Sequence, residues 1–432
     1  MSDIKVYTHS LGCPKNMVDS ENLLGGLGDI WSPAATPSEA DVVLINTCAF
    51  IRPAVEESLE SIFHAAHEIQ DLDPKPLLVV TGCLVSRYGS ELKREIPEAD
   101  LCVPVQGQQG LPEQILARLG RMPRPASGVA RPGPRNGFAY LKISEGCNNR
   151  CAFCTIPYIR GRLRSRPIPD LVEEASYLLS HGIQELVLVA QDTTAYGRDL
   201  KDGSDLSLLV KELSKLSGLK WLRVMYMYPS GLNKRLLGSL AEVSPPFVPY
   251  FDVPLQHAHP DILRKMGRPF NHDPMRVLKR IREFFPHAAI RTTLITGYPG
   301  EKEKHFRALL EFVRRARVQH LGVFSYYPEE GTRAAGFSGQ LARRIKDKRR
   351  QVIMQEQRFI SRQYLQGHVG LDMDVLVEGP HPEWPGLYTG RTWFQAPEVD
   401  GMTYISGPSV KTGELVRAEI RDSLEYDLEA LA

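Results

Sequence analysis

The feature that most restricts the fold is a regular alternation of apolar, strand-like runs with helix-like segments over most of the chain. Near-continuous apolar runs separated by helices are typical of parallel sheets with both faces covered. In the first 120 residues, strands are predicted at Lys5–Ser10, Asp41–Asn46 and Leu77–Thr81, with helices at Asp19–Leu27 and Val55–Ile69. An open parallel α/β sheet is therefore expected at the N-terminus.

The alternation resumes with longer units between Phe138 and about Ala335. The helical segments are clearest at Asp170–His181 and Glu303–Ala316. Six strand–helix units predict an open, partial (β/α)6 relative of the eight-unit parallel barrel. The six predicted strands are Ala139–Ile143, Glu185–Ala190, Leu222–Met227, Tyr250–Val253, Ile290–Ile295 and Leu321–Tyr326.

Shifts in composition divide the 432 residues into domains. A stretch rich in Pro, Gly and Arg predicts a linker, and Leu341–Gln366 has the pattern of one long polar helix. The short β-like runs beyond Val369, separated by Gly and Pro, predict a small antiparallel β-barrel. The expected limits are 1–120 for the N-terminal domain, 121–137 for the linker, 138–364 for the barrel with its connecting helix, and 365–432 for the small barrel.

The composition, 42% hydrophobic and 24% charged, is that of a globular protein. A run of about 18 apolar residues, as a membrane span requires, is missing, and Met1–Ser10 lacks the pattern of a secretory signal. The formal charge of +2 gives no global argument for binding nucleic acid. We therefore expect a cytoplasmic protein, in which the seven cysteines are more often metal ligands or catalytic groups than disulfides.

Three cysteines directly follow the first predicted barrel strand, in Cys147-Asn-Asn-Arg-Cys151-Ala-Phe-Cys154. At this spacing they can ligate three irons of a cubane 4Fe-4S cluster and leave the fourth iron open to a small molecule. A structural zinc site is the alternative, but it needs four ligands. His257 or His259, from a later strand, would have to supply the fourth.

A second set, Cys13, Cys48 and Cys83, is scattered in sequence, yet each residue follows a predicted strand. The carboxyl ends of adjacent parallel strands share one edge of a sheet, where ligands bind in open α/β folds. A second metal site is therefore predicted there, although buried cysteines also pack as small hydrophobic residues. Cys102 stands outside both sets and is interpreted as a core residue.

The spacing of Cys147, Cys151 and Cys154, with the aromatic Phe153 before the last cysteine, resembles the radical S-adenosylmethionine (SAM) enzymes. In that superfamily the open iron binds the amino and carboxylate groups of SAM. One electron from the cluster cleaves SAM to a 5′-deoxyadenosyl radical, which abstracts a substrate hydrogen. The cofactors carry this chemistry, and the protein positions them.

Nearly the whole chain resembles the methylthiotransferases, a radical SAM family with a cysteine-bearing N-terminal domain and a C-terminal TRAM barrel. SLGCPKNMVDSE, at 10–21, resembles the ribosomal-protein branch known as RimO, whereas a Tyr-Gly-Cys-Gln-Met-Asn type of motif is expected there in the tRNA branch. The motifs that support the RimO branch are INTCAFI at 45–51, ISEGCNNRCAFCTIP at 143–157 and DVPLQHAHPDILRKMGRP at 252–269.

This resemblance implies methylthiolation of the β-carbon of an aspartate in small-subunit ribosomal protein S-twelve. It also implies two 4Fe-4S clusters, with Cys13, Cys48 and Cys83 holding the one that carries the sulfur, and SAM as methyl donor and radical source. The expected partners are the ribosomal protein and an electron donor protein, without membrane or tRNA. The alternative is the same chemistry on an adenosine in tRNA; a redox-sensing module without turnover needs no such barrel or triad.

Residues that follow the barrel strands are candidate SAM contacts, because active-site residues of such barrels lie at the strands' carboxyl ends. Besides Phe153, the candidates are Gln191, Asp192, Asp252, Gln256 and Gly297. An N-cap is an equal alternative for the segment 191–194, and a lone loop histidine such as His257 is more often structural. The glycines of 295–301 permit close approach of a ligand, or form an ordinary turn.

Two basic segments have more than one interpretation. Arg160, Arg162, Arg164 and Arg166 alternate after the cysteine loop, and either attract RNA or an acidic surface or are solvated. The basic run in Ala342–Arg350 is interpreted as a solvated helix face.

Residues 365–432 carry twelve acidic and four basic residues, a net charge of −8, while the rest of the chain carries +10. A barrel that binds tRNA is expected to present Lys and Arg to the phosphates. An acidic barrel would instead attract a basic ribosomal protein. A solvated acidic surface without a partner is the alternative.

Overall fold

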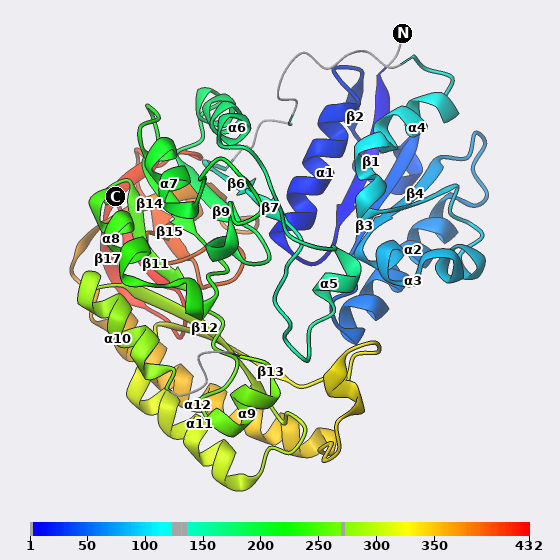
Figure 1. Cartoon of the computed structure of the whole chain (residues 1–432). Coiled ribbons are helices and arrows are strands. Elements are labelled where there is room, and N and C mark those ends of the chain that lie inside the picture. The colour runs from blue at the N-terminus through cyan, green and yellow to red at the C-terminus, as the bar shows by residue number, and fades with distance from the viewer. Residues whose placement is uncertain (1–2, 123–130, 132–135, 269–272) are drawn as a thin grey trace.

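Parallel sheets form the first two parts of the chain in the computed structural model, which describes residues 3–122, 131, 136–268 and 273–432 (Figure 1). The N-terminal sheet has the strand order β2-β1-β3-β4-β5, with every neighbouring pair parallel. Its strands are β1 (Ile4–Ser10), β2 (Trp31–Pro33), β3 (Val42–Thr47), β4 (Leu77–Gly82) and β5 (Leu101–Pro104). Its helices are α1 (Pro14–Gly26), α2 (Arg52–Ile69), α3 (Cys83–Glu95) and α4 (Leu111–Arg118), with the 3-10 turns η1 (Pro37–Glu39) and η2 (Val105–Gly110).

The three predicted strands of this sheet are confirmed as β1, β3 and β4. The edge strands β2 and β5 are additional, and they are too short to produce a clear periodic pattern. Cys102 lies on β5, where its partly buried side chain packs against the core between the sheet and α2. It is thus at the border of the core rather than inside it.

The central part is the predicted open barrel of six parallel strands, whose spatial order follows the chain. The strands are β6 (Phe138–Lys142), β9 (Glu185–Val189), β10 (Trp221–Val224), β11 (Phe247–Asp252), β12 (Ala289–Thr296) and β13 (His320–Ser325). A two-stranded sheet, β7 (Ser144–Glu145) and β8 (Arg164–Ser165), flanks the cysteine loop. β10 ends before the predicted Met227, because Tyr226 has a left-handed φ of 57° that ends an extended strand.

Helices cover the outer face of the barrel, and the largest hydrophobic cluster lies between them and the strands. They are α6 (Ile168–Ser180), α7 (Leu206–Ser214), α8 (Lys234–Glu242), α10 (Met275–Phe284) and α11 (Glu303–Ala316). The connecting segments contain the short helices α5 (Ile156–Ile159), whose Ile159 packs in the N-terminal core, and α9 (Pro260–Lys265), with η3 (Thr193–Ala195), η4 (Pro229–Gly231) and η5 (Arg333–Gly336). The long helix α12 (Arg343–Gln366) then leads to the C-terminal domain, as predicted. None of the helices in the described ranges is long and apolar enough to cross a membrane.

Most of the predicted linker, 121–137, lies outside the described residues. Of this segment, Arg131 is buried and pairs with Glu21 of α1 and with Glu174 of α6, the latter at 2.6 Å. It therefore ties the N-terminal domain to the barrel.

The C-terminal domain is a closed five-stranded barrel in the order β14-β15-β16-β18-β17. Its strands are β14 (Asp372–Pro380), β15 (Leu387–Thr392), β16 (Thr403–Ser406), β17 (Leu415–Ser423) and β18 (Leu428–Leu431). The predicted antiparallel arrangement holds for all neighbouring pairs except β16 and β18, which are parallel.

The loop between β15 and β16 closes the amino end of the partial barrel. Asp400 accepts a hydrogen bond from the Tyr250 hydroxyl (2.6 Å) and pairs with Arg291 (3.0 Å). Arg391 pairs with Glu185 at the start of β9 (2.7 Å). The carboxyl end of the barrel is therefore left to face the N-terminal domain, and α1 lies on that side (Figure 1).

Candidate active site between two groups of cysteines

Cys147, Cys151 and Cys154 lie together in the loop between β7 and α5. All three line one cavity of about 590 Å³, together with Asn149 and Arg162. The Asn149 backbone N–H points to the Cys147 sulfur (N···S 3.4 Å), and Arg268 donates to the Cys151 sulfur (3.4 Å). The loop thus presents three thiols with N–H donors on one side, as suits sulfur ligands that carry negative charge.

Burial raises the pKa of the Cys147 thiol, and it raises that of Cys154 to about 12. Without a metal these thiols therefore stay protonated at neutral pH. Binding of a metal ion releases the protons, because thiolate is the ligating form.

Cys13, Cys48 and Cys83 converge at the carboxyl edge of the N-terminal sheet. The neighbouring strands β3 and β4 pair in a register that places Thr47 opposite Gly82, so the next residues, Cys48 and Cys83, start from adjacent positions. β1 lies on the other side of β3, and Cys13 follows it. The three thiols are close enough for each to influence the pKa of another.

Gly12 makes this convergence possible. Its φ of +89° is a left-handed conformation, and a Cβ built there would lie only 2.6 Å from the Cys48 sulfur. A larger residue at this position would both strain the backbone and displace Cys48.

The three thiols of this second group differ in their electrostatics. Burial raises the pKa of Cys48 to about 11 and also raises that of Cys83. Burial acts on Cys13 in the same direction, but the charges of Lys15 and Arg160 together with backbone N–H donors at Asn16 and Lys15 outweigh it, and the net effect lowers the Cys13 pKa. The positive charge of the second site is therefore concentrated next to Cys13.

Arg160 joins the two groups of cysteines. It comes from the end of α5, directly after the first cysteine loop, and only 1% of its side chain is exposed. It pairs with Asp19 of α1 (3.0 Å) and Glu145 of β7 (2.9 Å), and it donates to the Asn16 side chain. The interpretation of Arg160 as a solvated or RNA-attracting residue is wrong, because these partners lie across the domain junction.

Lys142 completes the charged group at the junction. It pairs with Glu145 (2.9 Å) and with Asp19, as Arg160 does. Burial by itself raises the pKa of Glu145. Lys142 and Arg160 act against burial, and the net effect lowers this pKa to about 2. Glu145 in turn accepts a hydrogen bond from Gln191 (2.6 Å), so the junction reaches the candidate SAM residues.

The candidate SAM residues follow the strands of the barrel at its carboxyl end. Asp192 does not cap a helix; it accepts hydrogen bonds from Asn149 of the cysteine loop and from Thr194, both at 2.7 Å. Asp252 is buried, which raises its pKa, and accepts a hydrogen bond from the Tyr226 backbone N–H (3.1 Å). These acids hold the loops around the barrel mouth.

Gln256 and Phe153 are the next two candidates. Gln256 has a φ of +72° and bridges to β12 through its backbone, which leaves its side chain partly exposed. Phe153 packs beside a small core that contains Met266 and Tyr298. Both residues thus border the carboxyl end of the barrel.

Gly297, the last candidate, is packed against other parts of the protein. Its N–H points to both carboxylate oxygens of Glu301 (3.0 and 3.1 Å), and a Cβ there would lie 2.3 Å from the Lys346 stem. Lys346 is buried and donates to the Tyr326 carbonyl, and Arg349 pairs with Glu301 (2.6 Å). The interpretation of the basic run as a solvated face is therefore wrong for Lys346 and Arg349, which face inward.

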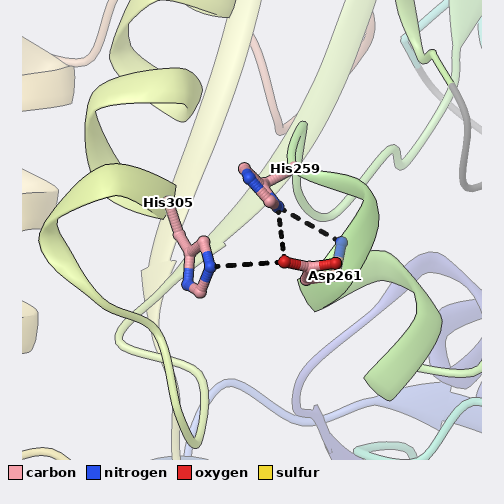
Figure 2. Close-up of side chains that lie close together, drawn as sticks. All are labelled: His259, Asp261 and His305. Atoms are coloured by element: carbon pink, nitrogen blue, oxygen red, sulfur yellow. Dashed lines mark hydrogen bonds and ion pairs between the residues drawn. The ribbon is translucent and has the colours of Figure 1, made fainter.

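His257 and His259 have partners of their own. The buried His257 has its Nε2 3.3 Å from Glu301, and its Nδ1 accepts the His259 N–H (2.9 Å). His259 stacks near His305 of α11, with Asp261 between the two rings (Figure 2). The zinc alternative, which needs one of these histidines as a fourth ligand to the cysteines, gains no support from this placement.

The three residues in Figure 2 each offer one possible metal ligand. However, Nδ1 of His259 accepts the Asp261 N–H (3.2 Å) and Nδ1 of His305 accepts the Lys302 N–H (3.0 Å). A neutral imidazole that accepts at Nδ1 carries its proton on Nε2 and has no second lone pair for a metal. We therefore interpret this group as a structural connection between α9 and α11.

The residues of both cysteine groups fit iron–sulfur clusters. Each group offers three thiols, and among the described residues the cavity lined by Cys147, Cys151 and Cys154 has no histidine or carboxylate in its lining. Three sulfur ligands suit a 4Fe-4S cluster with one open iron better than a structural zinc ion.

Several residues at this site escape sequence reasoning, namely Lys15, Asp19, Glu145 and Tyr226. Lys15 and Asp19 lie in the motif around Cys13, and Glu145 precedes Cys147 by two residues. Their closeness to the cysteines in sequence is the one feature that marks these three residues. Lys15 and Asp19 interact with residues of the other domain, which cannot be found from the local sequence.

Comparison with known proteins assigns the three parts of the chain. The Radical SAM superfamily matches residues 141–313, the uncharacterized protein family UPF0004 matches 5–104, and the TRAM domain matches 369–432. In solved structures, the radical SAM methyltransferase TsrM from Kitasatospora setae covers 90% of this chain and 81% of its own, with a TM-score of 0.57 and 17% identity. That likeness concerns the fold alone.

Curated relatives match over nearly the full length. The ribosomal protein uS12 methylthiotransferase RimO of Oleidesulfovibrio alaskensis is 52% identical over 99% of this chain and 100% of its own length. The protein of the same name from Aquifex aeolicus is 40% identical over 98% and 96%. The chain therefore belongs to the RimO branch of the radical SAM methylthiotransferase family.

Proposed function

We propose that this protein methylthiolates the β-carbon of an aspartate in ribosomal protein uS12, with SAM as methyl donor and radical source. Its relatives carry the name of uS12 methylthiotransferases. The observation that carries the proposal is the convergence of Cys13, Cys48 and Cys83 at one sheet edge, joined by Arg160 to the loop that holds the other three cysteines.

In this proposal, Cys147, Cys151 and Cys154 hold one 4Fe-4S cluster, and Cys13, Cys48 and Cys83 hold the other. When bound, the first supplies the electron that cleaves SAM, and the second supplies the sulfur. The protein's own part is to hold both groups at fixed positions and to exclude water.

The residues at the barrel mouth would orient SAM. Gln191 and Asp192 are anchored to Glu145 and Asn149, and Asp252 is anchored to the backbone of Tyr226. With Phe153 and Gln256 they form the proposed SAM contacts. Gly297 is the weakest member of that set, since Glu301 and Lys346 already occupy its surroundings.

We further propose that the acidic C-terminal barrel attracts the basic partner. Eight of its twelve acids are exposed, against three of its four bases. Such a surface would repel the phosphates of tRNA and steer a basic protein. A cytoplasmic location and a one-electron donor protein follow from this function.

The test is anaerobic reconstitution with iron and sulfide, followed by reaction with SAM, a reductant and either uS12 or tRNA. We expect about eight irons per chain, as two 4Fe-4S clusters require. Mass spectrometry should find one methylthio group on an aspartate of uS12 and none on tRNA. If an adenosine of the tRNA is modified and uS12 is not, the alternative substrate is favoured. An iron content of about four per chain would contradict the proposed second cluster.

A further inference from the structure

Lys15 is a buried cation that forms no ion pair with a carboxylate among the described residues. It is the second residue of α1, two positions after Cys13, and only 8% of it is exposed. Two other cations of the junction, Lys142 and Arg160, are each paired with both Asp19 and Glu145. Within the described parts of the chain, Lys15 forms no ion pair with any Asp or Glu.

The ammonium group of Lys15 reaches out of the N-terminal domain to the barrel. Its Nζ lies 3.6 Å from the centre of the Tyr226 ring. Tyr226 follows β10 at the carboxyl end of the barrel, where its strained backbone (φ 57°) is held by Asp252. The charge is therefore placed at the barrel mouth, near Cys13 of the second group.

A buried ammonium needs a compensating anion, because its removal from water is costly. The face of an aromatic ring compensates only partly. Two further features of the site favour negative charge: the amino end of the 13-residue helix α1 and the neighbouring Arg160. Lys15 thus brings a positive charge with which no carboxylate of the described residues forms an ion pair, although it acts on the Cys13 thiol and on Asp252.

We propose that Lys15 binds the carboxylate of the target aspartate and thereby selects an acidic side chain as the substrate. This inference rests on the proposed function. The carboxylate carbon is bonded directly to the β-carbon, so an ion pair with Lys15 fixes the reacting carbon to within one bond of an anchored group. Such anchoring would hold the β-carbon at the barrel mouth, beside Tyr226.

An adenosine has no carboxylate with which an ammonium group could form an ion pair. Lys15 is therefore a positioning residue that distinguishes the two substrates.

The second cluster, which carries thiolate ligands, is the other anionic group whose charge Lys15 could neutralise. Arg160 already lies beside the thiols of Cys13 and Cys83. Lys15 also acts on Cys13, but its ammonium lies on the ring of Tyr226 in the barrel. The contact with the barrel is what favours the substrate as the partner of Lys15, and the iron content of a Lys15 variant separates the two roles.

The experiment measures the affinity of the reconstituted full-length enzyme for uS12 and for uS12 whose target aspartate is replaced by asparagine. The wild type should prefer the aspartate form by about 30-fold, as expected when one partner of a buried charge pair is removed. Lys15→Met should bind both forms within about threefold of each other, whereas Lys15→Arg should keep most of the preference. Lys93→Met, an exposed lysine of the same domain, is the matched control and should behave as the wild type.

Iron content separates the two possible roles of Lys15. The Lys15→Met enzyme should retain about eight irons per chain. A loss of about four irons would assign Lys15 to the second cluster and overturn the proposal. An unchanged preference for aspartate in Lys15→Met would also overturn it. If the wild type binds neither form of uS12, the proposed function itself fails.

Discussion

The two groups of cysteines reach the domain junction by different routes. Cys147, Cys151 and Cys154 belong to one loop of eight residues, and their spacing alone brings them to one cavity. Cys13, Cys48 and Cys83 come from three strands, and the pairing of β1, β3 and β4 brings them together. The first site therefore depends on local sequence, and the second depends on the whole sheet.

The electrostatics of the two sites differ in the same way. The first group receives N–H donors mainly from its own loop and from Arg268. The second group receives its positive charge from Lys15 on its own helix and from Arg160 of the other domain. A change in the junction should therefore affect the second site before the first.

The largest expected effect comes from removing one ligand of each site. Cys151→Ala should abolish cleavage of SAM to 5′-deoxyadenosine, because it removes a thiolate from the proposed cleaving cluster. Cys48→Ala should retain most of that cleavage and abolish the transfer of sulfur to uS12. Chromatography of 5′-deoxyadenosine and mass spectrometry of uS12 measure the two steps. An equal loss of SAM cleavage in both variants would contradict the difference between the sites.

A second test disturbs the sheet edge without touching a ligand. Gly12→Ala should lose about four of eight irons, because a Cβ there would lie 2.6 Å from the Cys48 sulfur. Gly28→Ala is the matched control: its φ of +71° is also left-handed, but it has nothing within 4 Å. The control should keep the full iron content, and loss of iron in both variants would mean that backbone strain alone is responsible.

A third test breaks the connection between the two sites. Arg160→Met should lower the free energy of unfolding by about 3–5 kcal/mol, because it leaves the buried carboxylates of Asp19 and Glu145 with Lys142 alone. Arg162→Met removes an exposed arginine from the same segment and should change stability by less than about 0.5 kcal/mol. Urea unfolding followed by fluorescence measures both. Equal effects would show that Arg160 does not stabilise the junction.

The smallest expected effect concerns the C-terminal surface, remote from both sites. The triple variant Asp372→Lys, Glu383→Lys and Glu414→Lys should raise KM for uS12 by about threefold at low salt, with a smaller effect at high salt. Reversing Glu91, Glu95 and Glu98 of the N-terminal domain makes the same change in net charge and is the control. If both variants raise KM equally, total charge rather than the C-terminal barrel attracts the partner.

The strand–helix alternation and the Cys147 motif were readable in the sequence because both depend on residues close together in the chain. The periodicity of each segment predicts its own structure, and the order of strands in the barrel follows the chain. The sequence did not predict the short edge strands β2 and β5, nor the parallel pairing of β16 with β18.

Charged residues show the limit most clearly. Arg160, Lys346 and Arg349 lie in polar segments, and in sequence they look like solvated arginines and lysines. Each is buried or nearly so, because a carboxylate or a carbonyl from another element meets it. Such partners are distant in the chain and leave no periodic signal.

The sequence by itself determined the elements of the three domains, the first group of cysteines and the branch of the family, since these are properties of local patterns and motifs. Only the tertiary structure decided that Arg160 joins the two sites and that Lys15 reaches the barrel mouth without a carboxylate partner among the described residues. The physical reason is that burial and charge pairing are set by which surfaces meet when the N-terminal domain packs on the barrel, and those surfaces come from segments more than a hundred residues apart.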